Sequence, residues 1–175
     1  MEELVILVNE MDDACGEMEK LQAHQLGALH RAFSVFIFNS KGELLMQQRA
    51  KEKYHSSELW TNTCCSHPRL GEETSGAVTR RLMEEMGMKC ATTFAFSFLY
   101  HAPMENGLIE HEFDHVYFGY SDDLPQPNSA EVQDWKYVSL NKLQLEIKQF
   151  PKQFTAWLTI CLDKVIEHVA VSKSV

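Results

Sequence analysis

Residues 72–88 read EETSGAVTRRLMEEMGM, and this stretch decides the fold. It opens with two acidic residues and closes at Gly87, an order that suits the macrodipole and the C-cap of an α-helix. We therefore predict a helix over Glu72–Met86. Besides Glu72 and Glu73, its charged side chains are Arg80, Arg81, Glu84 and Glu85.

The spacing of these residues resembles the Nudix box, G-x5-E-x7-R-E-U-x-E-E-x-G-U, in which U is aliphatic. The positions that fit are Glu72, Arg80, Leu82, Glu84, Glu85, Gly87 and Met88. Ser66 replaces the first glycine of the box, and Arg81 replaces the glutamate after its arginine. An amphipathic helix with charge pairs four residues apart is the plain alternative. So many fixed offsets favour the box.

The exchange at Arg81 bears on chemistry. In Nudix hydrolases the carboxylates of the box hold Mg²⁺ against a diphosphate. An arginine in place of one carboxylate removes a metal ligand and adds a fork of donors that binds phosphate. The sequence thus indicates a diphosphate that is held rather than cut.

Apolar runs on both sides of the box predict strands. Their ranges are Leu4–Val8, 33–38, 43–48, Cys90–Tyr100, about Glu110–Tyr120 and Asp134–Leu140. Residues 39–42 (NSKG) have hairpin-turn chemistry, so the second and third strands are expected to pair antiparallel. Alternation at period two is expected to place four aromatic residues on one strand face: Phe94, Phe96, Phe98 and Tyr100.

A second helix is predicted to start at Pro151 and to run toward the C-terminus. Its apolar stripe consists of Phe154, Trp157, Leu158, Cys161, Leu162, Val165 and Ile166. The fold class is therefore α+β, a Nudix fold with a mixed β-sheet sandwiched between α-helices. The length of 175 residues suits one domain over residues 1–175.

The formal net charge of −9 argues against a nucleic-acid partner, because such proteins concentrate positive charge. An acidic protein that binds an anionic ligand needs a local basic pocket or bound cations. The five cysteines have no framework spacing, which favours reduced thiols in the cytoplasm. No apolar stretch approaches the roughly 20 residues that cross a bilayer, so no membrane is expected. For the oligomeric state we expect a monomer or a weak homodimer.

Side chains that can bind a metal occur at two kinds of place. Glu110 and Glu112 share one strand face at period two, and such neighbours repel unless a cation or a proton lies between them. A solvated strand face is the plain alternative. The histidines His24, His30 and His67, joined to this pair, would suit Mn²⁺, Zn²⁺ or Fe²⁺ better than an all-oxygen magnesium site. Spacing alone leaves open whether they converge.

Taken together, the residues resemble the type 1 isopentenyl-diphosphate delta-isomerase family, along nearly the whole chain. The resemblance rests on residues 29–34 (LHRAFS), residues 60–68 (WTNTCCSHP), the altered box and Glu110-His111-Glu112. The stretch TNTCCSHP is the most specific of these.

The resemblance implies a role for each matching residue. His24, His30, His67, Glu110 and Glu112 would bind Mn²⁺ (or Mg²⁺ or Zn²⁺), while Glu85 would accompany a Mg²⁺ carried by the diphosphate. Cys65 and Glu112 would be the acid–base pair, with Tyr100 beside the glutamate. The diphosphate would meet Lys20, Arg49, Lys53 and Arg81, and Trp157 would face the hydrocarbon. Plain alternatives stay open for Trp157 as core, for Tyr100 as an ordinary strand residue and for Lys53 as a loop charge.

The implied reaction interconverts isopentenyl diphosphate and dimethylallyl diphosphate through a tertiary carbocation. The substrate partner is thus a small isoprenyl diphosphate. A Nudix pyrophosphohydrolase would need the full set of box carboxylates and no Cys65. A catalytically idle binding module would have lost Cys65, Glu112 or a histidine. The sequence favours the isomerase over both.

Overall fold

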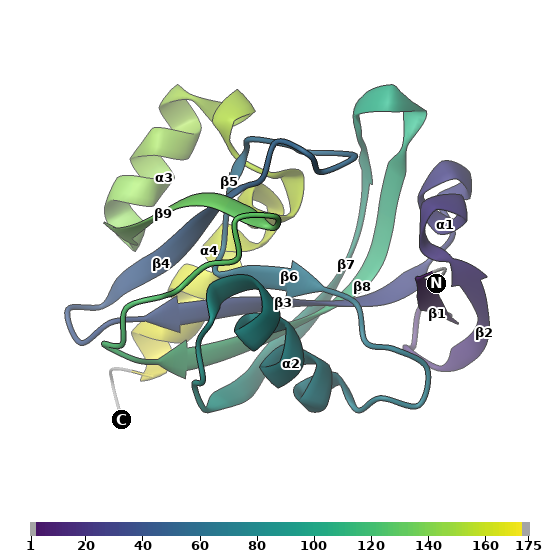
Figure 1. Ribbon diagram of the computed structural model, residues 1–175, viewed down its shortest axis with the longest axis horizontal. Coiled ribbons are helices and arrows are strands. Elements are labelled where there is room, and N and C mark those ends of the chain that lie inside the picture. Colours follow the sequence, from purple (N-terminus) through teal and green to yellow (C-terminus); the bar gives the residue numbers. More distant parts are fainter. Residues whose placement is uncertain (1–2, 173–175) are drawn as a thin grey trace.

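The computed structural model describes residues 3–172 (Figure 1). Its strands are β1 (Leu4–Val8), β2 (Ala14–Glu19), β3 (His30–Phe38), β4 (Glu43–Arg49), β5 (Trp60–Thr61), β6 (Cys64–Ser66), β7 (Thr92–Pro103), β8 (Ile109–Tyr120) and β9 (Val132–Ser139). Its helices are α1 (Lys20–Leu26), α2 (Thr74–Met86), α3 (Leu140–Gln149) and α4 (Ala156–Ser172), with 3₁₀ turns η1 (Glu105–Gly107) and η2 (Pro151–Gln153).

Strand β3 is the centre of a mixed sheet. It pairs parallel with β8 along its whole length, from His30 opposite Glu112 to Phe38 opposite Tyr120. Its other edge is shared, because β1, β6 and β4 each pair antiparallel with a short part of it. β7 continues the sheet beyond β8, and β9 continues it beyond β4.

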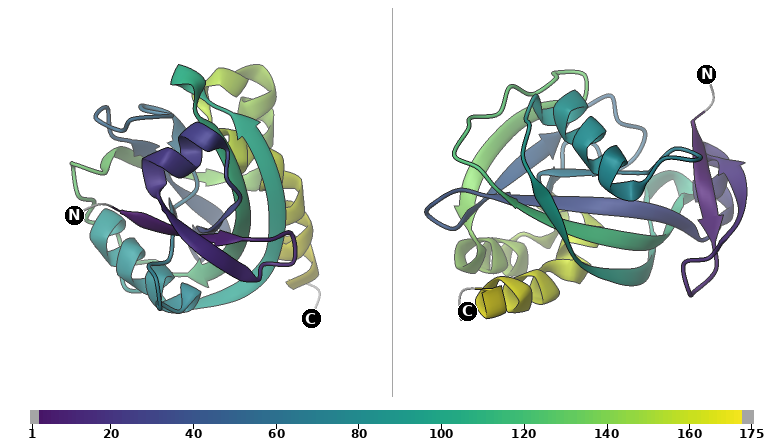
Figure 2. Two further views of the ribbon diagram at one scale, coloured as in Figure 1. Left: turned by 90° about the vertical axis from the view of Figure 1, so that its right-hand side faces the viewer. Right: turned by 90° about the horizontal axis from the view of Figure 1, so that it is seen from below.

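Helices cover both faces of this sheet (Figure 2). On β3, Phe33, Val35 and Ile37 pack into an apolar cluster with α2, whereas Phe36 and Phe38 pack into a second cluster with α3 and α4. A strand buried on both sides has to be apolar at successive positions, which explains the unbroken run at 33–38. The α+β class and the sandwiched mixed sheet are therefore confirmed.

The helix of the box ends as expected. Gly87 has a φ of 63°, and its N–H bonds the carbonyls of Leu82 and Met83. A side chain here would meet both a strained backbone and the carbonyl oxygen of Gln126. The start differs from the expectation: α2 begins at Thr74, and Glu72 lies before it, where its carboxylate accepts from Arg80 at 2.7 and 2.8 Å.

The expected row of four aromatic residues on β7 is wrong at its first member. Phe96 pairs with Val116 and Phe94 with Tyr117, so a β-bulge lies between them. The extra residue turns Phe94 to the opposite face, where it contacts His115 and Tyr117 and is 51% exposed. Phe96, Phe98 and Tyr100 remain together against the α4 cluster.

The antiparallel pairing of the two strands within residues 33–48 is confirmed, but it is limited to Phe38 and Leu44, because β6 pairs along the same edge of β3 and β5 along that of β4. Two further expectations need correction. The C-terminal helix starts at Ala156, since Pro151 opens only a 3₁₀ turn. The last predicted strand ends at Ser139, which caps the unpredicted helix α3 with its hydroxyl.

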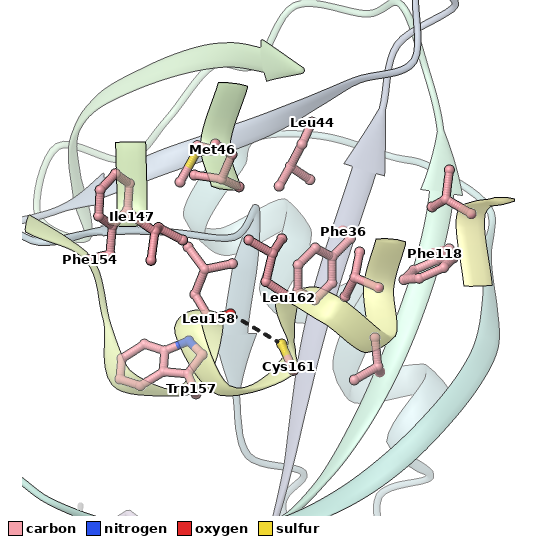
Figure 3. Packing of buried hydrophobic residues seen from close by; sticks show 14 of the residues in the cluster. Phe36, Leu44, Met46, Phe118, Ile147, Phe154, Trp157, Leu158, Cys161 and Leu162 are labelled. Atoms are coloured by element: carbon pink, nitrogen blue, oxygen red, sulfur yellow. Dashed lines mark hydrogen bonds between the residues drawn. The ribbon is translucent and has the colours of Figure 1, made fainter. Parts of the chain in front are cut away.

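Helix α4 carries the apolar stripe into the core (Figure 3). Leu158, Cys161 and Leu162 lie against Phe36 of β3 and the residues of β4. None of the helices within residues 3–172 is long and apolar enough to span a membrane. The three residues after Ser172 lie outside the described part of the chain.

Leu158→Ala should lower the free energy of unfolding by about 2–5 kcal/mol, because Leu158 is fully buried and its loss leaves a cavity. Ile160→Ala is the matched control on the same helix, since Ile160 is 47% exposed, and should cost about 1 kcal/mol or less. Urea unfolding measures both. Equal losses would contradict the burial of this helix face.

Candidate active site and metal centre

The site begins with the alternation of β3 and β8. On β8, Glu110, Glu112 and Asp114 share a face with Val116 and Phe118, which belong to the α4 cluster. On β3 the same face carries His30 and Ser34 before Phe36. Each strand is thus polar at one end of this face and apolar at the other, and the parallel pairing sets His30 directly beside Glu112.

Strand β6 decides between the two adjacent thiols. Its register sets Cys65 opposite Ser34 and Cys64 opposite Val35. Cys65 therefore lies on the same face as the carboxyl groups, whereas Cys64 is fully buried in the cluster under α2. Of the two thiols, only that of Cys65 lines the cleft described next.

A cleft that is partly open to solvent joins the polar and apolar ends of this face. Most of the predicted site residues line it: Lys20, Arg49, Lys53, Cys65, His67, Arg81, Glu85, Glu110, Glu112 and Trp157. His24, His30 and Tyr100 lie behind the wall of the cleft and are almost fully buried.

Three histidines and Glu112 converge at one wall of the cleft. The ligand atoms of His24, His30, His67 and Glu112 all lie within 4.8 Å of one another. His67 Nε2 is 3.1 Å from Glu112 Oε1 and 3.2 Å from His30 Nε2. Neighbouring ligands of a divalent ion with bonds near 2.1 Å stand about 3 Å apart. The spacing therefore fits a metal ion.

The tautomers of two histidines also suit the binding of a metal ion. Nδ1 of His24 contacts the carbonyl of Lys20 at 2.7 Å, and Nδ1 of His30 contacts that of Ala28 at 2.8 Å. A carbonyl only accepts hydrogen bonds, so both Nδ1 atoms carry the hydrogen and both Nε2 atoms offer a lone pair. His24 Nε2 is a buried nitrogen without a hydrogen-bond partner among the described residues.

Glu110 is not a member of the group formed by His24, His30, His67 and Glu112. Tyr100 donates from its hydroxyl to Glu112 Oε2 at 2.6 Å and lies 3.0 Å from Glu110 Oε2, so it bridges the two carboxyl groups. Glu110 forms a separate group with His24 and His55, and the ligand atoms of these three residues all lie within 4.8 Å of one another. His55 was missed from the sequence, because it lies in the irregular loop of residues 50–59, where no periodicity marks it.

Burial and charge separate the protonation states of these groups. Burial and the neighbouring charge of Glu112 raise the pKa of Glu110 well above its usual value. Burial would raise the pKa of Glu112 too, but His30 and His67 hold it well below the usual value. Burial lowers the pKa of His67 to about 4. Glu112 is therefore a carboxylate beside the neutral imidazole of His67, while Glu110 keeps a proton.

Burial also raises the pKa of the Cys65 thiol to about 12, although the nearby Arg49 guanidinium opposes the shift. Nη1 of Arg49 lies 4.0 Å from the Cys65 sulfur, and its guanidinium lies 5.3 Å from the ring centre of Trp157. Arg49 therefore contacts both the Cys65 thiol and the Trp157 indole, which an arginine that only binds phosphate need not do. In this structure the Cys65 sulfur therefore keeps its proton.

The other predicted cations each contact a carboxylate. Lys20 pairs with Glu3 at 3.1 Å, and Lys53 pairs with Glu131. Arg81 has more carboxylate partners than Lys20 or Lys53. They are Glu84 at 2.8 Å, Glu85 at 2.6 Å and Glu131 at 3.3 Å. The pair of Arg81 and Glu85 is the one that an ordinary amphipathic helix would form, and it also lines the cleft.

Trp157 belongs to both the core and the cleft. It is 3% exposed and lies in the α4 cluster, yet it also lines the cleft. Its indole N–H donates to Asn62 Oδ1 at 3.1 Å, and the amide of Asn62 donates to the carbonyls of Val35 and Cys64. The TNTCC segment therefore fixes the indole as well as the thiol.

The fold has known counterparts. A model of the NUDIX domain matches residues 28–158. DR0079 from Deinococcus radiodurans has a TM-score of 0.78 at 22% identity, over 93% of this chain and 98% of that one. A MutT NUDIX hydrolase from Burkholderia pseudomallei has a TM-score of 0.62 at 19% identity, over 78% and 98%. These likenesses show the fold alone, and the domain match defines the class as NUDIX.

Curated relatives are closer in sequence. Isopentenyl-diphosphate Delta-isomerase 2 of Aromatoleum aromaticum is 52% identical over 95% of this chain and 88% of that protein. Isopentenyl-diphosphate Delta-isomerase of Pectobacterium atrosepticum is 51% identical over 97% and 95%. This chain belongs to the isopentenyl-diphosphate Delta-isomerase family of NUDIX-domain proteins.

Metal binding should release a proton from Glu110. Because its pKa is raised, the proton competes with the metal, and metal affinity should rise with pH until that pKa is passed. Calorimetry of Mn²⁺ binding in buffers of different ionisation enthalpy counts the protons released near neutral pH. Glu110→Gln should release about one fewer than wild type. Equal proton release would contradict the protonated state of Glu110.

Proposed function

We propose that this protein interconverts isopentenyl diphosphate and dimethylallyl diphosphate. The observation that carries the proposal is a single cleft lined by a thiol, a carboxylate and an indole, with cations around its rim. Relatives about 50% identical over most of the chain bear the name of this reaction. The spatial requirement for such chemistry is an acid and a base that reach one small hydrocarbon.

The reaction adds a proton to the terminal CH₂ of the alkene and leaves a tertiary carbocation. A proton is then lost from the methylene between the cation and the carbon that bears oxygen, which forms the internal double bond. An unactivated alkene is a weak base, so the acid must be strong and well placed. We assign the two proton transfers to Cys65 and Glu112, whose roles exchange when the reaction runs in reverse.

The resting protonation states bear on this assignment. The structure holds the proton on Cys65 and leaves Glu112 ionised. For Glu112 to be the donor toward isopentenyl diphosphate, the proton must first move from sulfur to carboxylate. Tyr100, whose hydroxyl lies 2.6 Å from Glu112, would hold that carboxyl group in place through the transfer.

Trp157 would stabilise the carbocation. The negative face of an indole attracts a cation, with a gain of about 2 kcal/mol where water is excluded. The burial of Trp157 at the apolar end of the cleft provides this dryness. Dryness also protects the cation from capture by water, which would give an alcohol.

A divalent ion held by His24, His30, His67 and the two glutamates would supply positive charge that makes the protonated Glu112 a stronger acid. We propose Mn²⁺ for this position, with Mg²⁺ or Zn²⁺ as alternatives, since imidazole–carboxylate sites accept several ions. A Mg²⁺ carried by the substrate diphosphate would be held near Glu85, which Gln47 and Arg81 already orient by hydrogen bonds of 2.8 and 2.6 Å.

The chain would form one domain over residues 1–175 and would work in the cytoplasm as a monomer or weak homodimer. Its partner would be a small isoprenyl diphosphate, without nucleic acid or membrane. Arg81 disfavours the hydrolase alternative, because it stands where the Nudix box has a carboxylate that hydrolysis would need for metal.

The decisive experiment incubates isopentenyl diphosphate with the protein, Mn²⁺ and Mg²⁺ in D₂O. Dimethylallyl diphosphate should form with deuterium in its methyl group, as followed by NMR. Cys65→Ala should lower kcat by at least about 10²–10⁴-fold, the usual contribution of a positioned acid or base.

Cys15→Ala is the matched control, because Cys15 is an exposed thiol on β2 and should leave the rate unchanged. Release of inorganic phosphate without isomerised product would support a hydrolase instead. A Cys65→Ala protein as fast as wild type would remove the thiol from the mechanism.

Lys53→Met should raise KM for isopentenyl diphosphate by roughly 10–100-fold, since a hydrogen bond to a charged group contributes about 1.5–3 kcal/mol. Lys53 lines the cleft, whereas Lys51 in the same loop is exposed and does not line it. Lys51→Met should therefore leave KM unchanged. Equal KM values for both variants in steady-state assays would assign Lys53 to a solvated loop.

A further inference from the structure

The middle residue of Glu110-His111-Glu112 points away from the cleft. Side chains alternate along β8, so His111 lies on the face opposite to that of the two glutamates. Its register partner on β7 is His101. The two rings have their centres 5.1 Å apart, and His101 is exposed while His111 is half-buried. Two imidazoles therefore lie side by side on the outer face of the β7–β8 hairpin, and neither lines the cleft.

The separation of these rings is that of two ligands on one ion. Imidazoles that bind one ion through nitrogen at about 2.1 Å have ring centres roughly 4.5–5.2 Å apart, according to the angle at the metal. In the group near Glu112, the ring of His30 lies 5.0 Å from that of His24 and 5.0 Å from that of His67. The outer pair at 5.1 Å matches this spacing. Because His101 and His111 are register partners in a long ladder, the backbone itself sets their separation.

His111 also has the tautomer of a metal ligand. Its Nδ1 lies 3.0 Å from the carbonyl oxygen of Gly27. A carbonyl only accepts hydrogen bonds, so in the neutral ring Nδ1 carries the hydrogen and Nε2 has the lone pair. The Nδ1 atoms of His24 and His30 contact backbone carbonyls in the same way. A carbonyl on the far nitrogen is the usual support of a histidine that binds metal.

Helix α1 fixes the orientation of the His111 ring. The helix lies beside the β7–β8 hairpin (Figure 1), and it ends at Gly27, against which Ile109 packs. His115 is the contrasting case on the same face of β8, because its Nε2 lies 2.8 Å from the carboxylate of Asp12 and so already has a partner. A neutral imidazole keeps one lone pair in either tautomer, and exposed His101 can turn its own toward His111.

We propose that His101 and His111 form a binding site for a divalent cation of borderline softness, such as Cu²⁺, Ni²⁺ or Zn²⁺. Water completes the coordination, because the site faces solvent. Two nitrogen ligands disfavour Mg²⁺ and Ca²⁺, which prefer oxygen. The ion links β7 and β8 where their opposite faces carry Tyr100, Glu110 and Glu112, so it ties together the two strands that position these groups.

Nitrogen NMR of the imidazole rings tests the site, because it follows each histidine separately from those of the cleft. Metal-free protein is titrated with Zn²⁺ at neutral pH. The Nε2 resonance of His111 and one nitrogen resonance of His101 should shift together along a single binding curve. His101→Gln should weaken Zn²⁺ binding at His111 at least about tenfold, since the second, already positioned ligand is lost. His111→Gln should do the same at His101.

His115→Gln is the matched control, because His115 shares the face of His111 but bonds Asp12, and it should leave both binding curves unchanged. If Zn²⁺ does not shift the nitrogens of His101 and His111, the site does not exist. If His111 binds Zn²⁺ equally well without His101, a single surface imidazole holds the ion and the proposal is wrong. His101 is exposed, so His101→Gln keeps the test valid if His111→Gln unfolds. The readout needs no substrate, so its outcome is independent of the isomerase assay.

Discussion

Two carboxyl groups at alternate positions of one buried strand impose the main constraint on this molecule. Glu110 and Glu112 share a face of β8 inside the protein, where like charges so close cannot both persist without compensation. The two carboxyl groups are compensated in different ways. Imidazoles of His30 and His67 stabilise the charge on Glu112, and a raised pKa keeps a proton on Glu110. The metal ion that we propose would replace that proton as the compensating positive charge.

The same strand face brings the ionisable groups and the apolar residues of the cleft together. Beyond Asp114 the residues of β8 become apolar and join α4, so the cleft passes from charged to dry within a few residues. Ser34 donates to Asp114 at 2.7 Å at this border and satisfies one of its oxygens. The carbocation that we propose would form close to a carboxylate and away from bulk water.

The sequence predicted the parts that depend on local rules. The box predicted a helix that ends at Gly87, and it pointed to Arg81 and Glu85, which the structure brings into the cleft. Non-local pairing was beyond such rules. The bulge before Phe96 leaves no mark in the alternation, and α3 follows β9 without a break that composition reveals. His55 escaped notice because its neighbours are supplied by α1 and β8, which are distant in sequence.

The ion pairs around the mouth of the cleft affect how a substrate arrives. Lys20, Lys53 and Arg81 already face Glu3, Glu131 and Glu85, so little unbalanced positive charge projects into solvent. Long-range attraction of a free diphosphate is therefore weak, in a protein whose net charge is also negative. An anion accompanied by its own metal meets less opposition, and it forms its bonds by an exchange of partners at close range. Its capture then depends on this local exchange more than on the ionic strength of the medium.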